Sequence, residues 1–312
     1  MERRTDLALE VRESFPKDHI EISGVALKKK HYLEERIRIT TVEILNEAGE
    51  QQMKKPKGSY VTIEVTEKNR MDSKEKQERT MDKLAEKIAQ ILEEMLEGEK
   101  DGKLQEKERP VYLVAGLGNR FATPDALGPF VLEDVIVNRH IRKEFGEEAL
   151  DKKERELCAV SPGVMAQTGM ESQEILGGII DKIKPAGVVV IDALASRSVN
   201  RLCTTIQITD TGICPGAGIG NNRNALNKST LQVPVIAIGV PTVVDAGTIV
   251  SECMEETLLQ EGYSEQEIEL FLQGLSKDSI KNLFVTPKDI DEQIRNIGYV
   301  LAKGINLFAK GK

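Results

Sequence analysis

The chain has no tryptophan, only three histidines and four cysteines, and no long hydrophobic run in its 312 residues. The cysteines are widely spaced and form no CxxC pair, which disfavours both a structural zinc site and a disulfide framework. The longest apolar runs, near 186–195 and 233–244, are too short and too interrupted to span a bilayer. We therefore expect a cytoplasmic protein with no membrane partner.

Basic charge is also in deficit, since the formal net charge is −8. Without a global basic field, the composition gives no argument for direct nucleic-acid binding. The first residues, MERRTDLALEVRESF, carry early positive charge, but Glu10, Arg12 and Glu13 interrupt the apolar stretch that a secretory signal needs. With 40% hydrophobic and 30% charged residues, the chain is an ordinary globular one, long enough for a large core.

Histidine is scarce and badly placed for catalysis. His19 and His31 lie in a charged N-terminal stretch, and His140 lies near the end of a predicted helix. None follows a core strand, so Ser-His or Cys-His nucleophilic catalysis has no suitably placed base. Zinc catalysis on histidine ligands loses its usual donors for the same reason. We predict that all three histidines are surface residues.

From about residue 106 onward, apolar strands alternate with helical patterns. VYLVAG (111–116), GVVVID (187–192) and PVIAIGV (234–240) are continuous apolar runs, typical of strands buried on both faces. Alternation of strands and helices predicts right-handed crossovers and an α/β fold whose mostly parallel sheet has helices on both faces. The other predicted elements are strands at 157–160 and 204–210, the latter antiparallel or at an edge, and helices at 126–141, 172–184 and 286–309.

The first 105 residues form a different, added β/α section. RIRITTVEIL (36–45) and YVTIEV (60–65) are rich in β-branched residues and predict paired strands with a long connection. Residues 71–97 show helical spacing of apolar side chains, as expected of an amphipathic surface helix. The first 35 residues are charged and weakly patterned, and 98–110 reads as a polar linker. We therefore divide the chain into an N-terminal section up to 105 and a core at 106–312.

Three aspartates follow the buried strands of the core. Asp192 directly ends GVVVI, while Asp125 and Asp245 follow their strands through short loops. Open α/β sheets bind ligands at the carboxyl ends of their strands. Two carboxyl groups brought close together there cannot both ionise cheaply, so they share one proton and supply one base and one acid. The tripeptide Asp-Ala-Leu occurs at both 125 and 192; the alternative interpretation is that each aspartate only caps a helix.

The core also contains two glycine-rich stretches. AGLGNRFATP has no third glycine at the dinucleotide-binding spacing and no GK[ST] sequence. PGAGIGNNR is richer in glycine, but it follows an alternating strand and no long helix begins directly after it. We interpret them as tight turns that let the backbone approach a substrate, with a non-enzymatic nucleotide-binding module as a weaker alternative. The residues predicted to shape a cleft are Gly116, Gly118, Asn119, Arg197, Gly216, Gly218 and Asp245.

Several of these motifs, in this order, closely resemble the germination protease family of spore-forming bacteria. The resemblance covers most of 106–250, the first residues, where RTDLALE (4–10) is similar to a self-cleavage segment, and VTPK (285–288). Region 247–284 is compact compared with some family members. The motifs are GLGN (116–119), TPDALGP (123–129), SPGVMAQTGMES (161–172), IDALASRS (191–198), PGAGIGNNR (215–223) and VIAIGVPTVVDA (235–246).

The resemblance implies an atypical aspartic endopeptidase, made as a zymogen, that degrades small acid-soluble spore proteins in the spore core during germination. It implies a fold similar to hydrogenase-maturation peptidases and a homotetramer. Its two catalytic aspartates correspond to Asp125 and Asp192. Self-cleavage would fall between Asp6 and Leu7, which makes 1–6 the propeptide and leaves 7–105 as the N-terminal section.

Cofactors are not needed by a mechanism that uses only two carboxyl groups. The hydrogenase-type relatives, however, bind metal at related positions. A metal-dependent peptidase using Asp125, Asp192 and Asp245 as oxygen ligands is therefore the alternative.

Overall fold

The computed structural model describes residues 5–15, 22–32, 34, 36–65, 74–98, 110–151, 153–220, 223–274 and 283–311. Its strands are β1 (Val25–Tyr32), β2 (Ile37–Ile44), β3 (Gly58–Val65), β4 (Val111–Gly116), β5 (Glu156–Val160), β6 (Gly187–Ser196), β7 (Thr205–Thr209), β8 (Val235–Asp245) and β9 (Phe284–Val285). Its α-helices are α1 (Ala8–Glu13), α2 (Glu47–Met53), α3 (Lys74–Gly98), α4 (Leu127–Asp134), α5 (Arg139–Phe145), α6 (Met165–Thr168), α7 (Ser172–Ile183), α8 (Lys228–Leu231), α9 (Ala246–Gln260), α10 (Glu265–Gly274) and α11 (Ile290–Lys310). Short 3₁₀ turns lie at η1 (Thr123–Asp125), η2 (Glu147–Ala149), η3 (Val199–Arg201) and η4 (Ala217–Ile219).

In the described residues the strands form one sheet in the order β1-β2-β3-β7-β8-β6-β4-β5, with β9 paired to β8. Strands β5, β4, β6 and β8 run parallel to their neighbours in this group. β4, β6 and β8 are the continuous apolar runs of the sequence, and they are buried almost throughout, as parallel strands covered on both faces usually are. The largely parallel α/β core is therefore confirmed.

The N-terminal strands extend the same sheet in antiparallel fashion. β2 pairs with β1 and β3, and β3 pairs with β7, which in turn pairs with β8. The predicted pairing of 36–45 with 60–65 is confirmed, and α2 occupies their long connection. The prediction for this segment was an antiparallel strand or an edge strand. β7 is antiparallel, but it pairs with β3 on one side and β8 on the other, so it is not an edge strand. Its side chains are buried throughout, which is typical of an interior strand.

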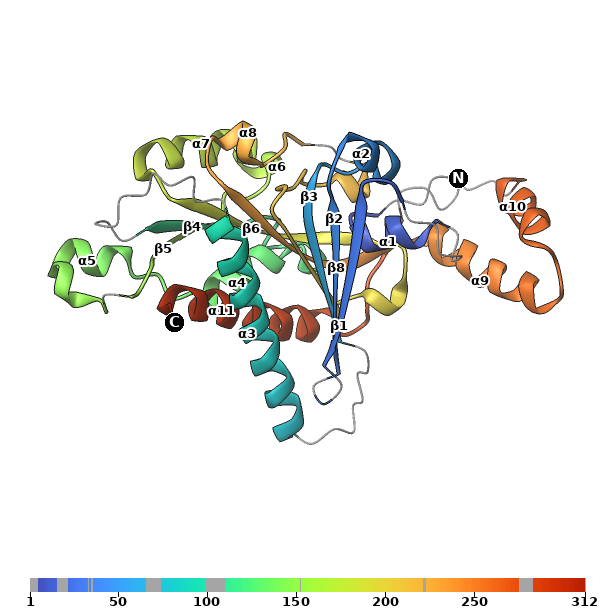
Figure 1. Ribbon diagram of the computed structural model, residues 1–312, viewed down its shortest axis with the longest axis horizontal. Helices are drawn as coiled ribbons and strands as arrows, with labels where there is room; N and C mark the ends of the chain where they lie inside the picture. The colour runs from blue at the N-terminus through green and yellow to red at the C-terminus, as the bar shows by residue number, and fades with distance from the viewer. Residues whose placement is uncertain are drawn as a thin grey trace.

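Helices cover both faces of the sheet (Figure 1). On one face α3, α4 and α11 pack on the largest hydrophobic core, to which all three contribute buried side chains. On the other face α7 and α8 close a second core over the parallel strands, while α1 and α2 close a third over β2 and β3. The predicted arrangement of helices on both faces is thus confirmed.

Some elements differ from the sequence-based predictions. The helix expected at 126–141 is two helices, α4 and α5, because Val135 takes an extended conformation with φ −74° and ψ 123°. Asn138 holds the break by accepting a hydrogen bond from Leu157 N–H (2.7 Å) and donating one to the Arg155 carbonyl (3.1 Å). Strand β1 was missed, since its lysine-rich side chains are mostly exposed and show no apolar alternation.

Other predictions concern the surface. His31 and His140 are exposed, as expected, whereas His19 and most of the predicted linker 98–110 lie outside the described residues. Across the described ranges, none of the helices has the length and apolar character needed to cross a bilayer.

Candidate active site

Asp192 lies inside strand β6, not at its end. Its backbone is in register with Gly239 of β8, and the pairing continues to Ser196. The prediction that Asp192 ends the strand was wrong, because ALAS is itself apolar and extends the pairing with β8. Asp192 therefore does not cap a helix, and its side chain is only 5% exposed.

Asp125 reaches the same region from the neighbouring strand β4. Leu117 N–H donates to the Ile191 carbonyl (2.8 Å), which joins the end of β4 to β6. Asn119 N–H donates to Asp125 Oδ2 (2.8 Å), and this bond holds the carboxylate. Gly118 has a φ of +106°, and a Cβ there would lie 1.8 Å from the Asp125 carbonyl oxygen. Only glycine fits this close approach of the loop to η1.

The two aspartates interact electrostatically. Burial raises the pKa of Asp192 well above its usual range, and the charges of Asp125 and Asp6 raise it further against a hydrogen bond from Ala193 N–H. Burial also raises the pKa of Asp125, opposed by the bond from Asn119. Asp125 and Asp6 thus lie close enough to Asp192 to interact with it electrostatically; we call these three the aspartate cluster. Raised carboxyl pKa values of this origin are typical of general acid–base sites.

Asp245 has a different environment. It is the N-cap of α9, where its Oδ1 accepts a hydrogen bond from Thr248 N–H at 3.1 Å. For this aspartate, the capping interpretation describes the observed contact. Among the residues that the structure describes, no three His, Cys, Asp or Glu side chains are grouped so that they could hold a metal ion.

The segment around Asp6 lies along strand β6. Asp6 N–H donates to the Ala195 carbonyl (3.2 Å), and Asp6 Oδ2 accepts from Ala195 N–H (2.9 Å). The β6–β8 register shifts between Leu194 and Ala195, and such irregularities re-aim backbone groups beside functional sites. A Cβ at Gly218 would lie 2.1 Å from Asp6 Oδ2, so the glycine leaves room for the carboxyl group. Burial raises the pKa of Asp6, opposed chiefly by the Ala195 bond and by Lys55.

The bond after Asp6 is held by two side chains that the sequence had not suggested. Lys55 Nζ (2.9 Å) and Gln207 Nε2 (3.3 Å) both donate to the Asp6 carbonyl oxygen. Gln207 Oε1 accepts from Ala8 N–H (2.7 Å), so its amide spans both sides of the fully buried Leu7. Gln207 was detectable as the one amide in an otherwise β-branched strand, whereas Lys55 carries no local signal.

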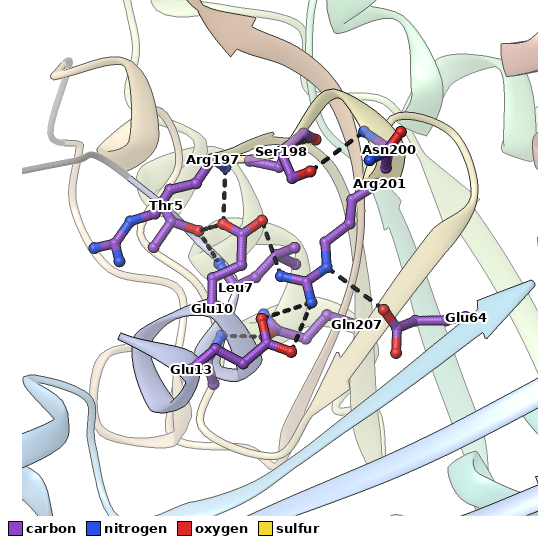
Figure 2. Close-up of polar contacts among 12 residues, drawn as sticks. Thr5, Leu7, Glu10, Glu13, Glu64, Arg197, Ser198, Asn200, Arg201 and Gln207 are labelled. Atoms are coloured by element: carbon purple, nitrogen blue, oxygen red, sulfur yellow. Dashed lines mark hydrogen bonds and ion pairs between the residues drawn. The ribbon is translucent and has the colours of Figure 1, made fainter. Parts of the chain in front are cut away.

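Close to the same segment, one arginine forms ion pairs with three glutamates, as Figure 2 shows. Arg201 contacts Glu10 (3.1 Å), Glu13 (2.7 Å) and Glu64 (3.4 Å). Glu10 is only 4% exposed, and its Oε2 also accepts from Arg197 N–H at 2.8 Å. We call Arg201 and these three glutamates the Arg201 cluster. It anchors α1 immediately after the Asp6–Leu7 bond.

The remaining predicted cleft residues have mainly backbone roles. A Cβ at Gly116 would lie 2.4 Å from the Gly128 carbonyl oxygen, which ties β4 to α4. Gly216 has a φ of +73° and precedes η4, the turn that carries Gly218. Arg197 meets the segment through its backbone N–H. These residues therefore shape the backbone around the aspartate cluster.

Comparison with known proteins finds a matching family and several similar proteins. The family model described as "Germination protease" matches residues 3–280. Curated proteins named "Germination protease" are 43% identical in Caldanaerobacter subterraneus subsp. tengcongensis and 40% identical in Clostridium perfringens. These matches cover 97% of this chain and 93% or 94% of each relative. A solved [NiFe] hydrogenase maturation protease, HycI from Thermococcus kodakarensis KOD1, is 16% identical, with a TM-score of 0.32, over 69% of this chain and 98% of its own.

Proposed function

The chain belongs to the germination protease family, and from this premise we propose that it is a self-processing aspartic endopeptidase made as a zymogen. It cuts its own Asp6–Leu7 bond and then degrades small acid-soluble spore proteins in the spore core during germination. The observation that carries the proposal is the position of Asp6, which is bound along β6 while its charge and that of Asp125 raise the pKa of Asp192. The homotetramer implied by the resemblance remains a prediction.

Asp125 and Asp192 share one proton in this mechanism. The ionised member takes a proton from a water molecule, whose oxygen bonds to the Asp6 carbonyl carbon. The protonated member then gives its proton to Leu7 N as the carbon–nitrogen bond breaks. The products are the carboxyl group of Asp6 and the amine of Leu7, and the pair has exchanged its protonation states. Because the two groups titrate as a coupled pair, neither role belongs to one residue.

Intact mass of the purified full chain tests the proposal. After incubation from mildly acidic to neutral pH, we expect a single mass loss that matches residues 1–6. The Asp192→Asn variant should keep its full mass, whereas Asp245→Asn should be cut normally, because asparagine also caps a helix. An unchanged wild-type mass at every pH would contradict self-processing. Loss of residues 1–6 from Asp192→Asn would refute the role of the aspartate pair.

Two further measurements define the reaction. A small acid-soluble spore protein should be cut by the processed wild-type chain and not by Asp192→Asn. Self-cleavage should also survive exhaustive chelation, and abolition by chelation would favour the metal-dependent alternative.

A further inference from the structure

One backbone oxygen in the N-terminal segment receives two side-chain donors from distant parts of the fold. Lys55 follows α2, and Gln207 lies on β7, yet both donate to the carbonyl oxygen of Asp6. In the proposed function this is the carbonyl of the bond that is cut. Donors that are fixed at such an oxygen are what hydrolysis of an amide requires, because negative charge develops there as water adds.

We propose that Lys55 and Gln207 are catalytic residues that bind the oxyanion formed at the cleaved carbonyl, first in self-cleavage and then in cleavage of substrate proteins. This inference rests on the proposed function and adds a second component to it. The aspartate pair handles protons, while Lys55 and Gln207 stabilise the charge on oxygen. In the proposed mechanism the proton of the aspartate pair goes to Leu7 N, so Lys55 and Gln207 are the donors assigned to the oxygen.

Gln207 is held rigidly for this task. It is 7% exposed, and β7 is fixed between β3 and β8. Because its Oε1 is occupied by Ala8 N–H at 2.7 Å, its Nε2 is directed at the Asp6 carbonyl. The Nε2 bond is 3.3 Å long in this ground state and can shorten as charge accumulates on the oxygen. Such preorganisation costs little reorganisation during the reaction.

Lys55 supplies a positive charge at the same oxygen. Burial lowers the pKa of its ammonium group, and Arg197 lowers it further, while Asp6, Cys214 and Glu10 oppose the shift. The charged form of Lys55 is therefore lost at a lower pH than for an exposed lysine. Activity that depends on this ammonium group should fall as the pH rises through that lowered pKa.

The first test replaces the glutamine donor without changing its size. Gln207→Glu keeps an acceptor for Ala8 N–H but removes the Nε2 donor. We expect the first-order rate of self-cleavage, followed by intact mass, to fall about 100-fold, the usual cost of losing one oxyanion donor. Gln90→Glu is the matched control, since it adds the same charge on the outer face of α3, where Gln90 contacts Glu94. A wild-type rate in Gln207→Glu would overturn the proposal.

The second test separates charge stabilisation from a purely structural role of Lys55. Lys55→Met should lose activity by a similar factor, and Lys55→Arg should restore much of it and move the alkaline limb of the pH–rate profile upward. If an active Lys55→Arg chain loses activity at the same alkaline pH as wild type, that loss belongs to the aspartate pair. The proposed role of Lys55 would then be wrong. Because this readout compares two active proteins, it does not depend on whether Gln207→Glu folds.

A third measurement uses the processed enzyme and the peptide RTDLALEV, the sequence of residues 4–11. Loss of an oxyanion donor should lower kcat with little change in KM, since the interaction strengthens in the transition state. A raised KM at unchanged kcat in Gln207→Glu would show that Gln207 only holds the substrate. If wild-type protein cuts neither itself nor the peptide, the proposed function fails and this inference fails with it. If wild-type protein cuts both itself and the peptide, and the Gln207 and Lys55 variants cut them equally fast, only the oxyanion inference fails.

Discussion

Two groups of acidic side chains flank the same short N-terminal segment, and they differ in their partners. In the Arg201 cluster, a guanidinium group lies among Glu10, Glu13 and Glu64. In the aspartate cluster, the pKa of Asp192 is raised by burial and by two further carboxylates. In the first group the glutamates have a cation partner that fixes their positions, whereas in the second burial and neighbouring carboxylates favour the protonated form of Asp192. The comparison separates a group that anchors α1 from a group whose electrostatics suit the proposed acid–base chemistry.

The largest expected effect comes from removing one member of the proposed aspartate pair. Asp125→Asn or Asp192→Asn should each slow self-cleavage by at least ~1,000-fold, within the range of general acid–base catalysis. The double variant should be no slower than either single variant, because residues that act as one unit are not additive. First-order rates from intact mass check this. A double variant slower by the product of the two single effects would show that the aspartates act independently.

Removing the cation of the Arg201 cluster should instead lower the stability of the fold. Arg201→Met leaves Glu10 buried without its cation and should lower the free energy of unfolding by about 3 kcal/mol at neutral pH. Urea unfolding measures this. Lys28→Met, which breaks a mostly exposed pair with Glu43 at 2.9 Å, should change stability by less than about 1 kcal/mol. Equal losses in the two variants would remove the distinction between the buried and exposed pairs.

A methyl group can be added beside Asp6 of the aspartate cluster without changing a residue of the Arg201 cluster. Gly218→Ala places its Cβ 2.1 Å from Asp6 Oδ2 and 2.9 Å from Ala195 Cβ. The displaced Asp6 should slow self-cleavage by about tenfold, a cost of roughly 1.4 kcal/mol in the transition state. Gly178→Ala, in α7 with nothing within 4 Å of its new Cβ, should cleave at the normal rate and gain up to about 1 kcal/mol of stability. Unimpaired cleavage by Gly218→Ala would contradict the observed position of Asp6.

The smallest expected effect is the dependence of stability on pH. The pKa of Asp192 is raised in the folded chain, so the folded state keeps a proton that the unfolded state has already lost. Stability from this group is highest below its unfolded pKa and falls as the pH rises toward its folded pKa. The Tm of Asp192→Asn should therefore gain on wild type as the pH rises from acidic to neutral. Parallel Tm curves would show that the carboxyl pKa is not raised by folding.

The sequence predicted the fold where local patterns determine structure. The continuous apolar runs at β4, β6 and β8 indicated buried parallel strands, and the β-branched runs at β2 and β3 indicated a pair. Strand β1 could not be found in this way, because its position depends on pairing with β2 and not on its own apolar side chains. Asp192 was predicted to end its strand because the continuation of β6 beyond it depends on pairing with β8. That partner strand lies more than 40 residues later in the sequence.

The candidate site was predictable only in part, for a similar reason. Asp125 and Asp192 could be proposed because each lies in or just after an apolar strand that is visible in the sequence. Lys55 and Gln207 contact Asp6 across separations of 49 and 201 residues. No short motif records such contacts, which arise only when the antiparallel and parallel parts of the sheet join through β7.

The joining of these two parts also sets an order of events during biosynthesis. The ribosome makes the segment around Asp6 first, while β6, β7 and the turn with Gly218 emerge roughly two hundred residues later. In the proposed function, a nascent chain therefore lacks the surroundings needed to cut the Asp6–Leu7 bond. On that proposal, self-cleavage waits until the late strands have docked, so removal of residues 1–6 would serve as a chemical record of completed folding.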